Sequence, residues 1–376
     1  MLSSLEIHRF KGLSECRLEN LSRVNLFVGK NNVGKSSLLE AISILLTKGS
    51  IGWIIDLLKS RGLSTSFGRD NEDGPKMLQQ NIASLFTGRN VDEFSRMPIV
   101  ILAKETDRTK RILRLQLGYL VDEKFIDESG SEQRKRIFLH SDQIDDGMDS
   151  CPGLCIEIDD KDWRYIPLMG YGMYAINADR GIEFVRPSST FSASNAKLFD
   201  RIAMTDMQHS LVEALQIIDP RIRDVNFLSD PLSARTEFRA AGAGAGERVP
   251  IVVLDSGPTR YPLRSMGDGV NRILTIILSM INCKGGTLLI DEFENGLHYT
   301  TLCQLWKMIF RLAKQLDIQV FVTSHSDDCI RSFIEADTDS DGTIMRLETR
   351  PEGIIGVPYT DRDELNYINR NNVEIR

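Results

Sequence analysis

Cysteine is scarce in this sequence, and long hydrophobic runs and any excess of positive charge are missing. The six cysteines among 376 residues include one close pair, Cys151 and Cys155, with no second cysteine or histidine pair near it at zinc-finger spacing. We therefore expect reduced thiols in a cytoplasmic protein. The longest apolar run, residues 273–281, is too short to span a bilayer, and the N-terminus lacks the charged and then apolar pattern of a secretory signal. No membrane association is expected.

The charge balance argues against a protein whose overall field attracts nucleic acid. Lysine and arginine total 46 against 53 aspartate and glutamate residues, a net charge of −7. Basic residues still gather locally, and this cluster consists of Lys104, Arg108, Lys110, Arg111, Arg114 and residues 134–136. One interpretation is a DNA-binding surface. The other is solvated strand faces and turns, which the interleaved Glu105 and Asp107 favour.

The order of apolar patterns predicts an α/β fold. Hydrophobic residues make up 41% and charged residues 26%, as in ordinary globular proteins. The middle of the chain predicts antiparallel strands over 98–158, one helix over 195–217 and a flexible hairpin tip at Ala240–Gly246. After residue 269, helices and strands alternate, which predicts a parallel sheet with crossover helices. Neither an internal repeat nor a sustained heptad pattern is present, so we expect no coiled-coil arm.

A glycine-rich loop lies between an apolar strand and a helix near the N-terminus. It consists of Gly29, Lys30, Asn31, Asn32, Val33, Gly34, Lys35 and Ser36, with Ser37 next in the helix. This is the P-loop pattern, in which the glycines let backbone N–H groups surround a phosphate. Lys35 would reach the β- and γ-phosphates, and the Ser36 hydroxyl would bind Mg²⁺. The alternative is a glycine-rich turn that fits the pattern by chance.

Two carboxylates follow a buried strand in the last third of the chain. The strand reads Thr-Leu-Leu-Ile and ends at Asp291 and Glu292. Asp291 is the expected Mg²⁺ partner, and Glu292 is placed to accept a proton from an attacking water. A helix N-cap is the other interpretation of the pair. The following strand ends at His325, which is predicted to contact a γ-phosphate or the water, although a structural role is the alternative.

These residues resemble the ABC-type ATPase heads shared by SMC proteins, RecF and the overcoming-lysogenization-defect (OLD) family. The similar segments are 10–12 and 38–42 around the P-loop, 264–269 before the last helices, 291–298, and His325. The resemblance implies a P-loop NTPase head with a mixed or parallel core sheet, an antiparallel β subdomain and a helical insertion. It also implies a division into 1–60 (head, P-loop), 61–250 (β subdomain and insertion), 251–345 (head, remaining motifs) and 346–376 (C-terminal elements).

The resemblance further implies residues that would act across a dimer. Segment 264–269 departs from the usual Leu-Ser-Gly-Gly-Gln signature but keeps a serine and glycines at a helix start, so Ser265, Gly267 and Asp268 are carried over. Asn295 falls in the D-loop, and residue 79 or 80, both glutamines, is a candidate for the Q-loop. The 51 residues after His325 are too few for the Toprim nuclease of OLD proteins, so any nuclease is expected to be a separate chain.

The function expected from these residues is ATP hydrolysis with Mg²⁺ by a switch that dimerises around ATP. Its output would pass to a partner such as a Toprim-like nuclease or a toxin, or to DNA, in genome defence or DNA repair. A nucleotide-locked scaffold with negligible turnover remains open. A small-molecule P-loop kinase is a further alternative, although Glu292 and His325 argue against it, because a kinase needs no hydrolytic base and excludes water.

Overall fold

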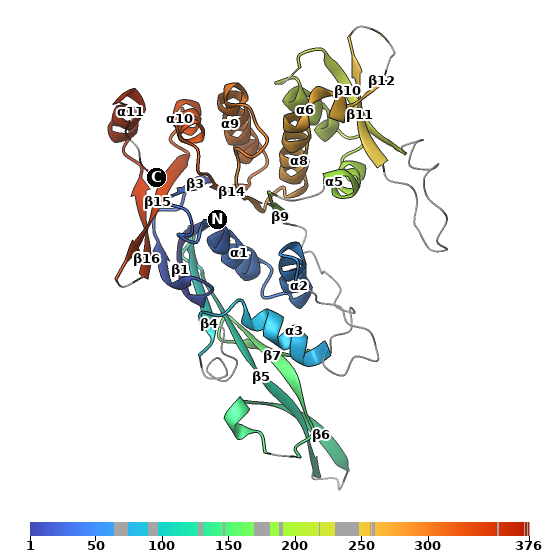
Figure 1. Cartoon of the computed structure of the whole chain (residues 1–376), viewed down its shortest axis with the longest axis vertical. Helices are drawn as coiled ribbons and strands as arrows, with labels where there is room; N and C mark the ends of the chain where they lie inside the picture. The colour runs from blue at the N-terminus through green and yellow to red at the C-terminus, as the bar shows by residue number, and fades with distance from the viewer. Residues whose placement is uncertain are drawn as a thin grey trace. The chain divides into compact units, whose positions relative to one another are not determined.

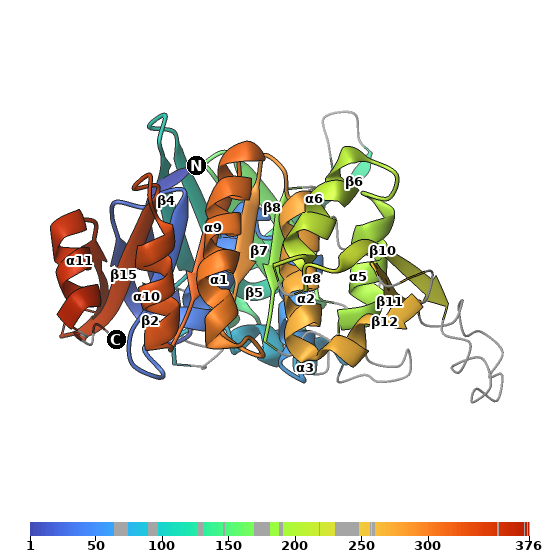
Figure 2. The same ribbon diagram turned by 90° about the horizontal axis from the view of Figure 1, so that it is seen from above.

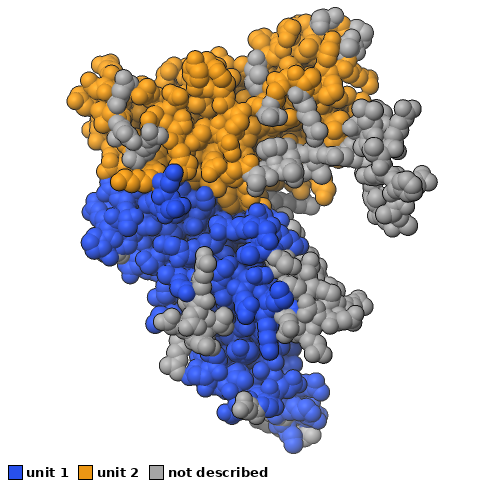
Figure 3. All heavy atoms as spheres, in the orientation of Figure 1, with its two compact units in different colours: residues 1–21, 31–179, 347–357 blue, residues 22–30, 180–346, 358–376 orange. Residues whose placement is uncertain are grey.

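The computed structural model divides into two compact units, which are described separately (Figure 3). Unit 1 comprises residues 1–21, 31–179 and 347–357, and unit 2 comprises residues 22–30, 180–346 and 358–376. The structure describes residues 1–63, 74–88, 97–126, 131–145, 147–168, 181–187, 191–217, 219–229, 248–255, 257, 260–351, 353–371, 373 and 375.

Unit 1 is built on a largely antiparallel sheet. Its strands are β1 (Leu2–Phe10), β2 (Leu13–Leu18), β4 (Ile99–Glu105), β5 (Lys110–Ile126), β6 (Glu132–Leu139), β7 (Ser150–Ile158), β8 (Asp162–Pro167) and the first part of β16 (Gly353–Tyr359). Their order is β8-β7-β5-β4-β1-β2-β16, with β6 also paired to β5. Only the pairing of β16 with β2 is parallel among those described here. Strands β4, β5, β6 and β7 are the antiparallel strands expected over residues 98–158, whereas β1, β2 and β16 come from outside that segment.

Helices cover the apolar face of this sheet. They are α1 (Lys35–Leu46), α2 (Ile51–Ser60) and α3 (Gly74–Ala83), while a short helix η1 (Ser141–Gln143) lies in a loop. Just beyond α1, a Cβ added to Gly49 would lie 2.8 Å from Ile156 and 3.3 Å from Leu113 and Leu115, so the end of α1 packs directly on the sheet. Alternating burial along β4 (Ile99, Ile101, Ala103) marks the same face.

Unit 2 contains the parallel sheet expected from the last third of the sequence. Its strands are β3 (Val24–Val28), β9 (Ile182–Val185), β13 (Thr287–Ile290), β14 (Gln319–Thr323) and the start of β15 (Gly342–Arg350), in the order β15-β3-β14-β13-β9. Every residue of β3, β13 and β14 is buried. Strands covered on both faces need continuous apolar runs, which explains their sequences.

Helices and a small antiparallel sheet complete unit 2. The elements are α5 (Phe191–Asp200), α6 (Asp206–Leu215), η2 (Leu263–Met266), α8 (Asp268–Asn282), α9 (Tyr299–Gln315), α10 (Asp327–Ala336), α11 (Arg362–Asn371), β10 (Ile222–Ser229), β11 (Arg248–Leu254) and β12 (Arg260–Pro262). Helices α8, α9 and α10 lie side by side (Figures 1 and 2). The fully buried Trp306 of α9 packs against Phe293 and Phe333, with ring centroids 4.3 and 4.9 Å away.

The structure confirms the predicted fold class, an α/β fold with a mixed sheet, and corrects one element. The single helix expected over 195–217 is wrong, because α5 ends at Asp200 and α6 begins at Asp206. Met204 has a φ of 62°, and the Thr205 hydroxyl accepts a hydrogen bond from the Met207 N–H, which starts a new helix. The expected hairpin tip at Ala240–Gly246 lies outside the described residues. No helix in the described ranges is long and apolar enough to cross a membrane.

Candidate active site

The glycine-rich loop joins β3 to α1, as expected from the sequence. Three of its residues have positive φ: Gly29 at 144°, Asn32 at 62° and Gly34 at 99°. A Cβ on Gly34 would also lie 2.6 Å from Cδ2 of Leu13, so both the backbone conformation and the available space require glycine there. Lys30, Asn31 and Asn32 are exposed, whereas Val33 is buried.

Helix α1 begins directly at the end of this loop. Its N-cap is Gly34, which offers no side chain to the N–H groups of the first turn. Lys35, the first residue of the helix, is only 4% exposed, and Ser36 and Ser37 are half-buried. Backbone N–H groups at a helix start, a buried ammonium and a hydroxyl together match the chemistry of a phosphate with a bound cation.

The carboxyl ends of three parallel strands meet at one edge of the unit 2 sheet. Phe27 of β3 is opposite Thr323 of β14, and Val322 is opposite Ile290 of β13. The glycine-rich loop therefore leaves β3 at the same edge as Asp291 and the residues that follow β14. This edge is where open α/β sheets bind their ligands.

Thr323 connects the two predicted acidic residues. Its hydroxyl donates to Oδ1 of Asp291 at 2.6 Å and accepts from the N–H of Glu292 at 2.9 Å. Asp291 is only 8% exposed, while Glu292 is half-buried. The sequence did not single out Thr323. Its place at the end of the neighbouring strand was the available signal.

Arg272 of α8 contacts the same segment from the other side. Its Nη2 donates to the carbonyl oxygens of Asp291 at 2.8 Å and Glu292 at 3.2 Å, and its Nη1 donates to the Arg186 carbonyl at 2.8 Å. Burial lowers the pKa of this guanidinium, and the nearby carboxylates, Asp291 first, oppose the shift. Sequence reasoning missed Arg272, although it is the only charged residue within the apolar segment 269–281.

His325 lies just beyond β14 and is half-buried. Its backbone N–H donates to Oε1 of Glu294 at 2.7 Å. Through this hydrogen bond, Glu294 connects the segment after β13 to the segment after β14. The structure brings the three predicted residues Asp291, Glu292 and His325 together at one sheet edge.

The residues expected to act across a dimer lie at the start of α8 and in the segment after β13. Ser265 is exposed, and its hydroxyl donates to the Pro262 carbonyl at 2.7 Å. Gly267 is the exposed N-cap of α8, with a φ of 98°. Asn295 is exposed and its Nδ2 lies 3.5 Å from Oε2 of Glu292. The Asp268 side chain lies outside the described part of the chain.

The glutamine candidates for a Q-loop lie in α3. The Gln79 side chain is buried and donates to the Gly118 carbonyl at 3.3 Å, whereas Gln80 is exposed. An amide that is committed to a backbone carbonyl inside unit 1 has less freedom to meet a ligand.

Three of the eight residues of the basic cluster on unit 1 form ion pairs with acids. Arg111 pairs with Glu105, Arg114 with Glu157 at 2.9 Å and with Asp160, and Arg136 with Asp122 at 2.8 Å. This pairing agrees with solvated strand faces. The six cysteines are free, and the described residues include no group of three or more His, Cys, Asp or Glu side chains arranged to bind a metal.

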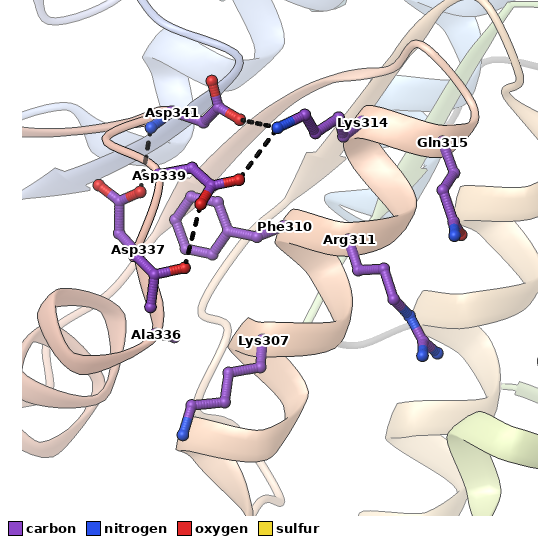
Figure 4. Close-up of a pocket in the computed structure, with 10 residues that line it drawn as sticks. Lys307, Phe310, Arg311, Lys314, Gln315, Ala336, Asp337, Asp339 and Asp341 are labelled. Atoms are coloured by element: carbon purple, nitrogen blue, oxygen red, sulfur yellow. Dashed lines mark hydrogen bonds and ion pairs between the residues drawn. The ribbon is translucent and has the colours of Figure 1, made fainter.

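A hollow of about 470 Å³ lies at the opposite edge of the unit 2 sheet, between the end of α9 and the loop before β15 (Figure 4). Lys314 lies 3.0 Å from Asp339 and 3.9 Å from Asp341, and Oδ1 of Asp337 accepts from the Asp341 N–H at 3.0 Å. These contacts satisfy the acidic loop without a metal. The hollow is therefore separate from the candidate active site.

Known proteins are similar to this chain over most or part of its length. A family model described as an AAA ATPase domain matches residues 1–152 and 185–330. An ATP/GTP phosphatase of Helicobacter pylori is 21% identical over 354 residues, covering 88% of this chain and 86% of the relative. A DNA replication and repair protein RecF of Cellvibrio japonicus is 34% identical over 101 residues, which cover 27% of this chain and 23% of that protein.

The fold is similar to that of an Smc head. A crystal structure of an Smc head bound to the C-winged helix domain of ScpA aligns with a TM-score of 0.51 at 12% identity, covering 97% of this chain and 99% of that one. The likeness shows that this chain shares the fold of an Smc head.

Proposed function

Because the chain belongs to the AAA ATPase domain family, we propose that it is an ATP-hydrolysing switch of the ABC type. The observation that carries this proposal is the single sheet edge in unit 2 where Asp291, Glu292 and His325 meet the strand that leads into the glycine-rich loop. Phosphate binding and a base for water are the two requirements of nucleotide hydrolysis. A relative that aligns with 88% of this chain is named ATP/GTP phosphatase, which is in keeping with that activity.

The side chains divide the chemistry between them. The backbone of residues 29–34 and the ammonium of Lys35 bind the phosphates of ATP. Hydroxyl and carboxylate oxygens are the ligands that Mg²⁺ prefers, so Ser36 and Asp291 fit that ion, which would neutralise charge on the β- and γ-oxygens. Glu292 accepts the proton of the attacking water, and His325 orients the water or the γ-phosphate.

The finer parts of the proposal rest on the resemblance to ABC-type heads. Two copies would face each other, and Ser265, Gly267 and Asn295 of one copy would complete the site of the other. All three residues are exposed, which a contact across a dimer requires. We also propose membership of the OLD-like branch, with a separate nuclease, a toxin or DNA receiving the signal in genome defence or repair.

Glu292→Gln tests the proposal. The change keeps the shape of the side chain and removes the basic oxygen, so we expect ATP turnover to fall about 10²–10⁴-fold. ATP binding should survive, because Lys35, Ser36 and Asp291 are unchanged. The measurements are phosphate release and size-exclusion chromatography with Mg-ATP, in which the variant should accumulate an ATP-bound dimer.

Glu335→Gln is the matched control, since Glu335 is an exposed carboxylate of the same unit that lies 3.7 Å from Lys307. It should hydrolyse ATP at the wild-type rate. Wild-type turnover in Glu292→Gln would contradict the assignment of the base and make His325 the next candidate. Absence of any ATP turnover in the wild-type protein, with ATP still bound, would favour the locked scaffold.

A further inference from the structure

Arg272 is a buried charge that none of the nucleotide motifs accounts for. It is only 3% exposed and lies in α8 among the apolar residues of the unit 2 core. All of its hydrogen bonds go to backbone carbonyls, those of Arg186, Asp291 and Glu292. It makes no ion pair with a described residue, and its Nε is buried without a hydrogen-bond partner among them.

Such a residue is a poor stabiliser of a core. Removing a guanidinium from water costs free energy, and backbone carbonyls compensate it less well than a carboxylate does. An apolar side chain at this position of α8 would leave no buried charge to compensate. The contacts therefore point to a role in fixing the geometry of the segment that Arg272 touches.

That segment contains a residue in a strained conformation. Glu292 has a φ of 49°, in the left-handed region that a side chain with a Cβ disfavours. Its carbonyl accepts from Arg272 and its N–H donates to the Thr323 hydroxyl, so the backbone is fixed on both sides. Strained residues persist where their surroundings over-determine them, and they cluster at functional sites.

The first turn of α8 is in close contact with this segment. A Cβ added to Gly269, in the first turn of α8, would lie 2.9 Å from the carbonyl oxygen of Gly296. The backbones approach closely at that point. Arg272, one turn further along, thus extends from a helix whose position relative to Glu292 is fixed by direct contact.

We propose that Arg272 is a positioning residue for ATP hydrolysis, which maintains the left-handed backbone of Glu292 and thereby aims its carboxylate at the attacking water. The inference rests on the proposed function, in which Glu292 is the base. Arg272 touches neither nucleotide nor water in this account. Its effect should therefore appear in turnover and not in ATP affinity.

Arg272→Lys tests the proposal, because lysine keeps the charge but cannot donate to three carbonyls in the planar geometry of arginine. We expect kcat to fall about 10²-fold, the loss typical of a reacting group displaced by about 1 Å. The dissociation constant for Mg-ATP, measured by calorimetry, should stay at the wild-type value. If the lysine variant does not fold, Arg272→Gln, with a neutral amide, takes its place with the same expectation.

Thr275→Val is the matched control on the same helix. Thr275 is buried, and its hydroxyl accepts from Asn195 at 2.8 Å and donates to the Asn271 carbonyl at 2.9 Å, so both of these hydrogen-bond partners lie outside residues 291–296. The melting temperature of Thr275→Val should fall at least as far as that of Arg272→Lys, while the kcat of Thr275→Val remains at the wild-type value. A kcat loss in Thr275→Val equal to that in Arg272→Lys would overturn the positioning role in favour of general damage to α8.

The double variant Arg272→Lys/Glu292→Gln separates positioning from an independent effect. If Arg272 acts through Glu292, the double variant should hydrolyse ATP no more slowly than Glu292→Gln alone. A further fall of the same factor would overturn the inference. If Glu292→Gln is inactive and Arg272→Lys turns over normally, this inference fails and the proposed function stands. If Glu292→Gln is fully active, the proposed function fails first.

Discussion

Replacing Thr323 by valine should destabilise unit 2 and slow turnover together, because one hydroxyl makes both contacts to the acidic pair. Valine has nearly the shape of threonine, so the change removes hydrogen bonds without opening a cavity. The bond to the Asp291 carboxylate is short, 2.6 Å, and a bond to a charged group contributes about 1.5–3 kcal/mol. The Glu292 N–H would lose its 2.9 Å partner, at a cost of about 1 kcal/mol where water can reach it.

The expected loss in free energy of unfolding is therefore about 2.5–4 kcal/mol. Thr323→Ser is the control, since serine keeps the hydroxyl and loses one buried methyl group, at a cost of about 1 kcal/mol. Its kcat should stay close to wild-type, whereas that of Thr323→Val should fall with the loss of Glu292 geometry.

Urea unfolding followed by the fluorescence of Trp306 measures this difference within unit 2. The chain has three tryptophans, so Trp53→Phe and Trp163→Phe leave Trp306 as the only one. Trp306 packs against Phe293, 4.3 Å between ring centroids, next to the acidic pair. Equal stability and equal turnover in the valine and serine variants would refute the reasoning.

Three further predictions concern other parts of the molecule. Lys35→Ala should weaken ATP binding by at least about 1.5–3 kcal/mol in calorimetry, because it removes the cation aimed at the phosphates, and equal affinity would contradict the P-loop assignment. Ser265→Arg should bind ATP but not hydrolyse it, and mixing it with Lys35→Ala should restore turnover through one intact composite site. If the mixture shows no ATP turnover, the proposal of composite sites loses its support. Burial raises the pKa of Glu183 to about 7 against 4.5 for the ordinary carboxyl, with Arg201 opposing the shift. The folded state then binds more protons between these values, so stability should fall as pH rises from 4.5 to 7, and Glu183→Gln should flatten this slope in urea unfolding at pH 5 and 8.

Local patterns were enough to find the elements that carry the motifs. The strand expected to end at Asp291 covers residues 287–290 in the structure, and a helix follows the glycine-rich loop as expected. Both predictions rest on the burial of one helix face or of a whole strand. Such burial produces an apolar pattern in consecutive residues, which can be recognised in the sequence. The break between α5 and α6 was missed, because the apolar spacing continues across it and the Thr205 N-cap that starts α6 does not interrupt that spacing.

Long-range pairing lies beyond such patterns. The order β15-β3-β14-β13-β9 sets strands far apart in sequence beside one another, and no local spacing encodes it. The same holds for Arg272, whose acceptors are backbone carbonyls that every residue possesses. Sequence reasoning named the groups proposed to act on ATP and missed Arg272 and Thr323, which hydrogen-bond to Asp291 and Glu292.

The difference between residues that bind ATP and residues that position Glu292 bears on the choice between a switch and a locked scaffold. The loop at residues 29–36 and Asp291 concern binding, so they would be needed in either case. The switch requires Glu292 in one defined orientation, and the backbone of Glu292, with a φ of 49°, is held by hydrogen bonds from both α8 and β14. The contacts of Arg272 and Thr323 therefore favour turnover. A chain with the binding loop intact and both side chains replaced by apolar ones should behave as the scaffold.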